Sequence, residues 1–153
     1  MKLNELSIAE FQSKLDLIDF NLVRLKLAQT EHGLGWSQHK VDLAEKQYKQ
    51  YLTLQYLFAS ETPLVPTKLA DQYWHQHILD TRQYARDCEA LFGRFFHHFP
   101  YFGLRGADDA QALVEASAKT RALTRQFFPD VENDFADCSG TSCSSCQSCS
   151  EQG

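Results

Sequence analysis

Four cysteines near the end of the chain are the residues whose type and spacing most directly suggest chemistry. They follow the pattern Cys-x4-Cys-x2-Cys-x2-Cys and comprise Cys138, Cys143, Cys146 and Cys149. Four thiolates suffice to surround one tetrahedral Zn ion or a soft ion such as Cu(I). The residues between them are Ser, Gly, Thr and Gln, which let the backbone wrap an ion but supply no apolar shell. We expect adaptable metal binding here; the alternative is a low-complexity tail with incidental thiols.

A second group of candidates lies on a segment in which histidines stand beside acidic and aromatic residues. At about 100° per residue of helix, His75 and His77 point roughly 200° apart and cannot share one ion. His77 falls on the apolar face, so we expect it in the core, bonded to Thr81, a tyrosine or a backbone carbonyl. Asp71 and His75 share one face, where the carboxylate could orient the imidazole for metal binding or proton transfer. The structural alternatives are a core histidine and a surface helix pair.

The aromatic stretch at residues 94–106 adds two further histidines. It is too apolar for an exposed loop, so we expect it to fold onto the helices, where His97 or His98 could complete a cluster. Packing of the segment without any such cluster is the alternative. The candidate pocket comprises Asp71, Trp74, His75, His77, His97 and His98.

Helices must position these residues, because apolar side chains recur at spacings of three and four along most of the chain. A Ser-x-x-Glu capping box at Ser7 predicts one long helix, broken near Gly33. Ser37 caps a second helix that runs to about residue 60, and Thr67 caps a third that ends near Gly93. A fourth helix starts at Asp108 or a neighbour and stops at residue 129. The first helix has the predicted core stripe Ile8, Phe11, Leu15, Ile18, Leu22 and Leu25.

These elements predict an all-α fold, a compact bundle of about four helices with antiparallel or closely related packing. An aromatic-rich connection precedes the last helix. Residues 1–134 form the helical domain, and residues 135–153 form a disordered Cys/Ser-rich tail, because that composition cannot build a core.

Composition narrows the classes of partner and compartment. The 153 residues include 20 acidic and 15 basic side chains, so the chain lacks the positive charge that binds nucleic acid. The first residues lack the apolar core of a signal peptide, and no stretch approaches the roughly 18 apolar residues of a membrane span. We expect a cytoplasmic protein. In that reducing compartment the cysteines indicate metal or redox chemistry before disulfides.

Several motifs resemble the glycine-rich domain-containing protein-like family over roughly residues 40–105. They are Thr62-Pro-Leu-Val-Pro66, Asp71-x-x-Trp74-His75-x-His77, Tyr84 with Asp87-Cys88, and Phe92-Gly93. The resemblance implies a stand-alone bacterial-type member. It implies no reaction, because the family is largely uncharacterised and its plant members are multidomain proteins linked to growth and stress responses. This chain lacks their glycine-rich region.

The leading hypothesis is a non-enzymatic protein that binds Zn or Cu through the C-terminal cysteines. The first alternative is a metal-dependent or acid/base enzyme that uses the histidines with Asp71. The second is a protein-interaction module in which the aromatic segment is partly exposed and binds a protein partner.

Overall fold

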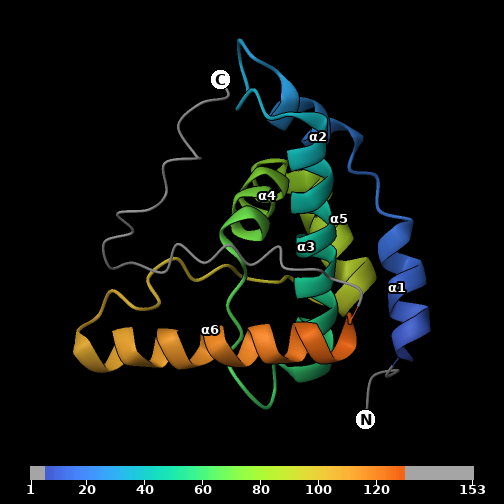
Figure 1. The fold of residues 1–153 in the computed structure, drawn as a ribbon. Helices are drawn as coiled ribbons and strands as arrows, with labels where there is room; N and C mark the ends of the chain where they lie inside the picture. Colours follow the sequence, from blue (N-terminus) through green and yellow to red (C-terminus); the bar gives the residue numbers. More distant parts are fainter. Residues whose placement is uncertain (1–5, 130–153) are drawn as a thin grey trace.

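The computed structural model describes residues 6–129, and in this range the chain forms six α-helices and no strand. The helices are α1 (Ile8–Asp16), α2 (Asn21–Ala28), α3 (Gln38–Phe58), α4 (Lys68–Leu79), α5 (Thr81–Phe92) and α6 (Ala107–Phe127), as Figure 1 shows. The all-α class is confirmed, but the expected number of helices is wrong. The cysteine tail and the expected boundary near residue 134 lie outside the described range.

The expected first helix is two helices, α1 and α2. Its capping box is present: the Ser7 hydroxyl accepts from the Glu10 backbone N–H, and the Glu10 carboxylate accepts from the Ser7 backbone N–H. Phe11 and Leu15 of the predicted stripe are buried, whereas Leu22 and Leu25 are exposed. Phe20 is also buried, and on a straight helix it would lie opposite Phe11. The break between the helices therefore lets α1 and α2 bury different faces against α3.

The expected third helix is also two helices, α4 and α5, which meet at Asp80. The Thr67 cap is confirmed, and the left-handed Gly93 at φ 65° ends α5 as expected. At Asp80 the backbone leaves the helical region with ψ at 75°, and its carboxylate accepts from the Gln83 backbone at 3.3 Å. This N-cap turns α5 into a new direction and brings it beside α1.

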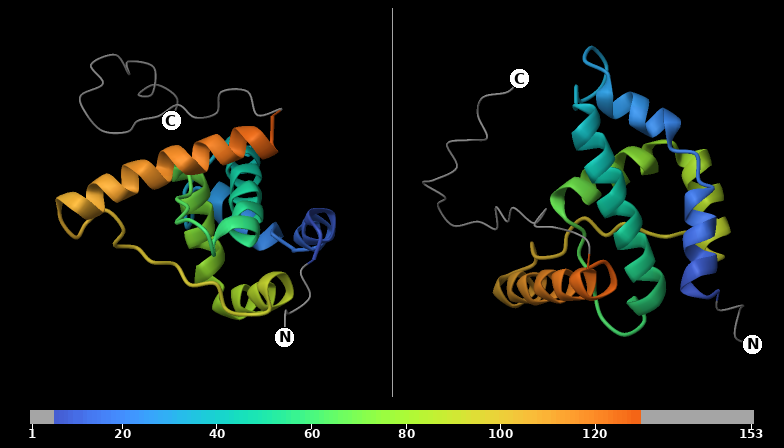
Figure 2. Two further views of the ribbon diagram at one scale, coloured as in Figure 1. Left: turned by 90° about the horizontal axis from the view of Figure 1, so that it is seen from below. Right: turned by 45° about the vertical axis from the view of Figure 1, so that its right-hand side comes forward.

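Helix α3 is the centre of the core and contacts α1, α2, α4 and α6. Its Ser37 cap is confirmed. Helix α6 lies crosswise near the C-terminal end of α3, where the rings of Phe58 and Phe127 pack 5.3 Å apart (Figures 1 and 2). An antiparallel four-helix bundle was therefore the wrong arrangement. Within residues 6–129 no helix is long and apolar enough to cross a membrane.

At residues 95–99 the aromatic segment folds onto the helices with every second side chain. Phe96 and His98 are partly buried, while Phe95, His97 and Phe99 between and beside them are exposed. This alternation is that of an extended chain, in which successive side chains point to opposite sides. The expectation that the whole segment packs down is therefore correct for one face of it and wrong for the other.

Candidate functional site

Helix α4 supplies two groups of the candidate site, and the fold explains their position. The Thr67 hydroxyl accepts from the Ala70 backbone at 3.1 Å and starts the helix one turn before Asp71. Asp71 and His75 lie one turn apart, and their Oδ2 and Nε2 atoms are 3.4 Å apart. The predicted shared face is thus confirmed.

The aromatic segment brings in the third group, His98. Tyr84 donates a hydrogen bond to the Phe96 carbonyl, and the Phe96 ring stacks on Trp74 at 5.0 Å and 9°. Two residues further on, the His98 ring lies on the same indole at 4.3 Å. The buried Trp74 ring therefore packs against both Phe96 and His98, and this contact directs the His98 imidazole toward α4.

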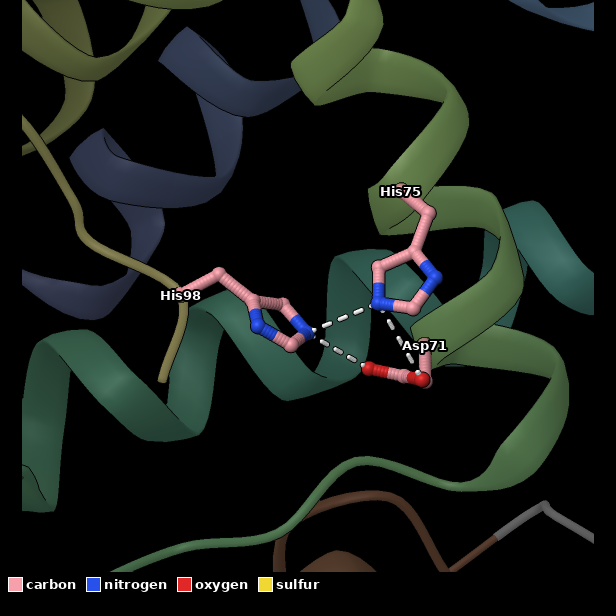
Figure 3. A group of neighbouring side chains, drawn as sticks. All are labelled: Asp71, His75 and His98. Atoms are coloured by element: carbon pink, nitrogen blue, oxygen red, sulfur yellow. Dashed lines mark hydrogen bonds and ion pairs between the residues drawn. The ribbon is translucent and has the colours of Figure 1, made fainter. Parts of the chain in front are cut away.

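Three side chains converge at this point (Figure 3). His98 Nε2 lies 2.8 Å from Asp71 Oδ1 and 2.9 Å from His75 Nε2. Within residues 6–129, these residues form the one group of three or more His, Cys, Asp or Glu side chains close enough to hold a metal ion. The side chains of Asp71, His75 and His98 are 34, 53 and 16% exposed, so solvent reaches the cluster.

Hydrogen bonding alone does not satisfy these three contacts. In a neutral imidazole Nε2 carries either one hydrogen or one lone pair in the ring plane. If His98 donates to Asp71, it has no lone pair for His75; if it accepts from His75, its lone pair faces the carboxylate. A cation at the centre can accept a lone pair from each of the three side chains at once.

The spacing also fits a metal ion. At metal–ligand distances of about 2.0–2.1 Å, neighbouring ligand atoms are about 2.9 to 3.4 Å apart in octahedral or tetrahedral geometry. Here His98 Nε2 lies 2.8 Å from Asp71 Oδ1 and 2.9 Å from His75 Nε2, and His75 Nε2 lies 3.4 Å from the second carboxylate oxygen, Oδ2. Two imidazoles and one carboxylate match ligand sets that bind Zn or Fe(II) and leave positions open.

His77, two residues after His75, has an opposite environment. It is 1% exposed, so its predicted core position is confirmed. Its Nδ1 accepts from the Tyr48 hydroxyl at 3.0 Å, and its Nε2 lies 2.8 Å from Asp87 Oδ2. Burial lowers the pKa of His77, and burial raises the pKa of Tyr48 well above its ordinary value. The imidazole is therefore neutral, with Nε2–H donating to Asp87.

Of the predicted partners of His77, the tyrosine is correct, whereas Thr81 and a backbone carbonyl do not fill the role. Asp87 was missed as its partner, although its place in the Asp87-Cys88 motif was a signal. His97 does not join the cluster; it is exposed, and its ring lies 4.8 Å from that of Phe95. The four candidate cysteines lie outside the described residues.

A hollow of about 560 Å³ lies elsewhere, between α1, α2 and α3. Its charged groups neutralise one another, since Arg24 binds both Asp42 and Glu45. Lys49 lies 3.2 Å from Glu45 and 3.6 Å from Asp16. This internal pairing leaves the hollow without a clear preference for a charged ligand.

The fold and the cluster together define a small all-helical protein with a solvent-facing group of three potential metal ligands. The chain belongs to the UCP032817-like family, whose model matches residues 14–126. That match includes all six helices in whole or in part, and the complete cluster. No curated protein and no solved structure matches the chain.

Proposed function

We propose that this protein binds one divalent transition-metal ion through Asp71, His75 and His98. The observation that carries the proposal is the convergence of the three side chains on His98 Nε2, which lies 2.8 Å from Asp71 Oδ1 and 2.9 Å from His75 Nε2, two contacts that one ring nitrogen cannot both satisfy. Zn(II) and Fe(II) suit two imidazoles and a carboxylate.

The small number of ligands bears on what the ion does. Structural Zn sites are usually closed by four protein ligands, whereas catalytic sites keep a position for water or substrate. A three-ligand site that solvent reaches favours the second kind. We therefore prefer an open site in which the ion polarises a bound molecule. Such a site favours the metal-dependent enzyme among the alternatives, without identifying its substrate.

Calorimetric titration with Zn(II) tests the proposal in the full chain with its four tail cysteines replaced by serine. We expect one site, and His98→Ala should weaken its affinity by about 100-fold or more, which corresponds to 2.7 kcal/mol. His97→Ala is the matched control, because this neighbouring histidine points away from the cluster. Equal affinity in the His98 and His97 variants would refute the site.

The tail cysteines are a second candidate site, for Zn or Cu(I). The observation that favours it is the spacing of Cys138, Cys143, Cys146 and Cys149, which supplies four soft ligands within twelve residues. Under reducing conditions, Cu(I) should bind the unaltered chain and be lost when these cysteines become serine. Retention of Cu(I) by the serine variant would exclude the tail as its site.

The sequence motifs, the tail cysteines and the net charge support a more specific family relationship and a cellular location. We infer that the chain is a relative of the glycine-rich domain-containing proteins, because the family match spans the tryptophan, histidine and Asp-Cys motifs. We also propose a reducing, cytoplasmic setting, in which the tail thiols stay available for metal, and no nucleic-acid partner, given a net charge of −5.

Exposed aromatic residues favour the protein-interaction alternative. Phe95, Phe99 and Tyr101 are 46, 55 and 59% exposed along the same segment that carries His98. Replacing Phe95 and Phe99 by serine should leave metal binding unchanged. If that variant lost a partner recovered with the unaltered chain, docking would be an additional role of this segment.

A further inference from the structure

We propose that Tyr48 is a redox-active tyrosine that gives up an electron through Trp74 to an oxidant beside His98. The proposed metal site enters this inference only as the source of the oxidant. The tyrosine and its proton acceptor are a separate feature, inside the core.

Tyr48 has a base in direct contact with its hydroxyl. The side chain is fully buried, and its hydroxyl lies 3.0 Å from Nδ1 of His77, whose other ring nitrogen faces the Asp87 carboxylate. Loss of an electron makes a phenol strongly acidic, and a buried phenol cation would be costly. Transfer of the proton to Nδ1 avoids that cost. Asp87, 2.8 Å from Nε2, then stabilises the imidazolium.

Trp74 connects this pair to the surface cluster. Its ring lies 4.3 Å from the ring of His98 and 6.5 Å from that of Tyr48, near-parallel to the latter at 28°. Trp74 is 4% exposed and therefore shielded from solvent. An electron can thus pass from Tyr48 to the cluster through one intervening aromatic ring.

Two other tyrosines contact Trp74 and provide an internal comparison. The Tyr51 ring lies 5.4 Å from it, and Trp74 Nε1 donates to the Tyr84 hydroxyl at 2.9 Å. Their own hydroxyls donate to the carbonyls of Leu64 and Phe96. A backbone carbonyl accepts a hydrogen bond but does not take up the proton. Of these three tyrosines, Tyr48 alone is paired with a base.

Tyr73 is the next ring beyond Tyr48, at 5.4 Å. It donates to Glu45 at 3.2 Å, but that carboxylate is already bound by Arg24 and Lys49. Tyr73 therefore shares its acceptor with two cationic side chains. The oxidised state should rest on Tyr48.

The electrons and protons balance in two steps. Hydrogen peroxide takes two electrons, and two protons from solvent, to give two waters; one electron comes from Fe(II), which becomes Fe(III), and one from Trp74. The Trp74 radical cation then takes one electron from Tyr48. At the same time the Tyr48 O–H bond breaks and an N–H bond forms at Nδ1 of His77. The products are neutral Trp74, a neutral Tyr48 radical and a His77 imidazolium.

Photochemical oxidation tests the pair without metal. The full chain carries serine at the four tail cysteines. Trp36→Phe leaves Trp74 as the only tryptophan, and Tyr101→Phe removes an exposed tyrosine. A flash-excited ruthenium tris-bipyridine with persulfate supplies the oxidant, and electron paramagnetic resonance detects the radical. We expect a tyrosyl radical that decreases about tenfold or more in Tyr48→Phe and in His77→Gln.

Tyr51→Phe and Tyr84→Phe are the matched controls and should keep the radical. Circular dichroism confirms the fold of each variant, and Asp87→Asn, which should lower the yield, replaces His77→Gln if the latter does not fold. An unchanged radical in Tyr48→Phe would overturn the proposal, as would an equal loss in all three phenylalanine variants.

A second arm separates this inference from the metal proposal. The same chain loaded with Fe(II) is mixed with hydrogen peroxide and freeze-quenched, with His98→Ala as the control. A Tyr48-dependent radical that disappears in His98→Ala supports both proposals. If the Tyr48 radical forms by photolysis, and also forms with peroxide in His98→Ala, Tyr48 is redox-active. The proposed metal site is then refuted as the source of its oxidant.

Discussion

His75 and His77 stand two residues apart on one helix, yet their surroundings have little in common. His77 is buried, and each ring nitrogen has a partner of the correct kind. His75 is half exposed and converges with His98 and Asp71 in contacts that their protons cannot all satisfy. The helical period of 3.6 residues sends the two rings to different sides. The comparison shows that a histidine with a hydrogen-bond partner for each ring nitrogen is structural. A histidine with polar contacts that its protons cannot satisfy is a candidate metal ligand.

The largest expected effect is stabilisation by Zn(II) at the site that includes the exposed His75. Zn(II) at about 100 times its Kd should stabilise the tail-serine chain by about 2.7 kcal/mol. That corresponds to a rise in Tm of about 5 to 11 °C for a chain of this size. Calorimetric unfolding measures it, and His97→Ala should show the same rise. A full rise in His98→Ala would place the ion elsewhere.

The second prediction contrasts the two histidines directly in the metal-free chain. His77→Ala should lower the free energy of unfolding by about 1 to 3 kcal/mol, because it leaves Tyr48 and Asp87 without their partner and opens a cavity. His75→Ala should cost less than about 1 kcal/mol, since the side chain is half exposed. Urea unfolding measures both, and equally small effects would contradict the structural role of His77.

The third prediction concerns pH and the buried histidine. Burial lowers the pKa of His77 below its ordinary value of 6.5, so the unfolded chain binds its proton more readily than the folded one. The contribution of His77 to stability is therefore complete above about pH 6.5 and is lost as the pH falls toward the folded pKa, by up to about 1.4 kcal/mol per pH unit. Thermal unfolding between about pH 7 and 5 should show this slope, and His77→Gln should reduce it. An unchanged slope in that variant would assign the effect to other groups.

Much of the fold follows from local signals. Ser7, Ser37 and Thr67 cap helices as their sequence contexts predict, and Gly93 ends one. The two breaks were missed because apolar spacing continues through each of them. Asp80, with Gln83 three residues later, carried a capping signal inside a segment that otherwise reads as one helix.

The candidate site could be predicted only in part. Asp71 and His75 follow from helical spacing alone. The choice of His98 over His97 depends on the register of an extended segment, and a shift of one residue exchanges the two faces. That register is set by Phe96, which stacks on Trp74 and accepts from Tyr84. Contacts between segments this far apart in sequence have no local signal.

The smallest effect is expected from removing the tail. Truncation after Asp134 should leave the Tm of the helical body almost unchanged, because Phe127 and Phe128 are the last of the described residues that pack against the buried cluster, and the sequence beyond Asp137 is too polar to build a core. The same truncation should abolish Cu(I) binding while Zn(II) still binds Asp71, His75 and His98, so one variant separates the two candidate sites. Thermal unfolding followed by circular dichroism measures the first outcome and metal titration the second. A fall of more than about 8 °C, equivalent to well over 1 kcal/mol, would mean that residues beyond 134 belong to the folded domain.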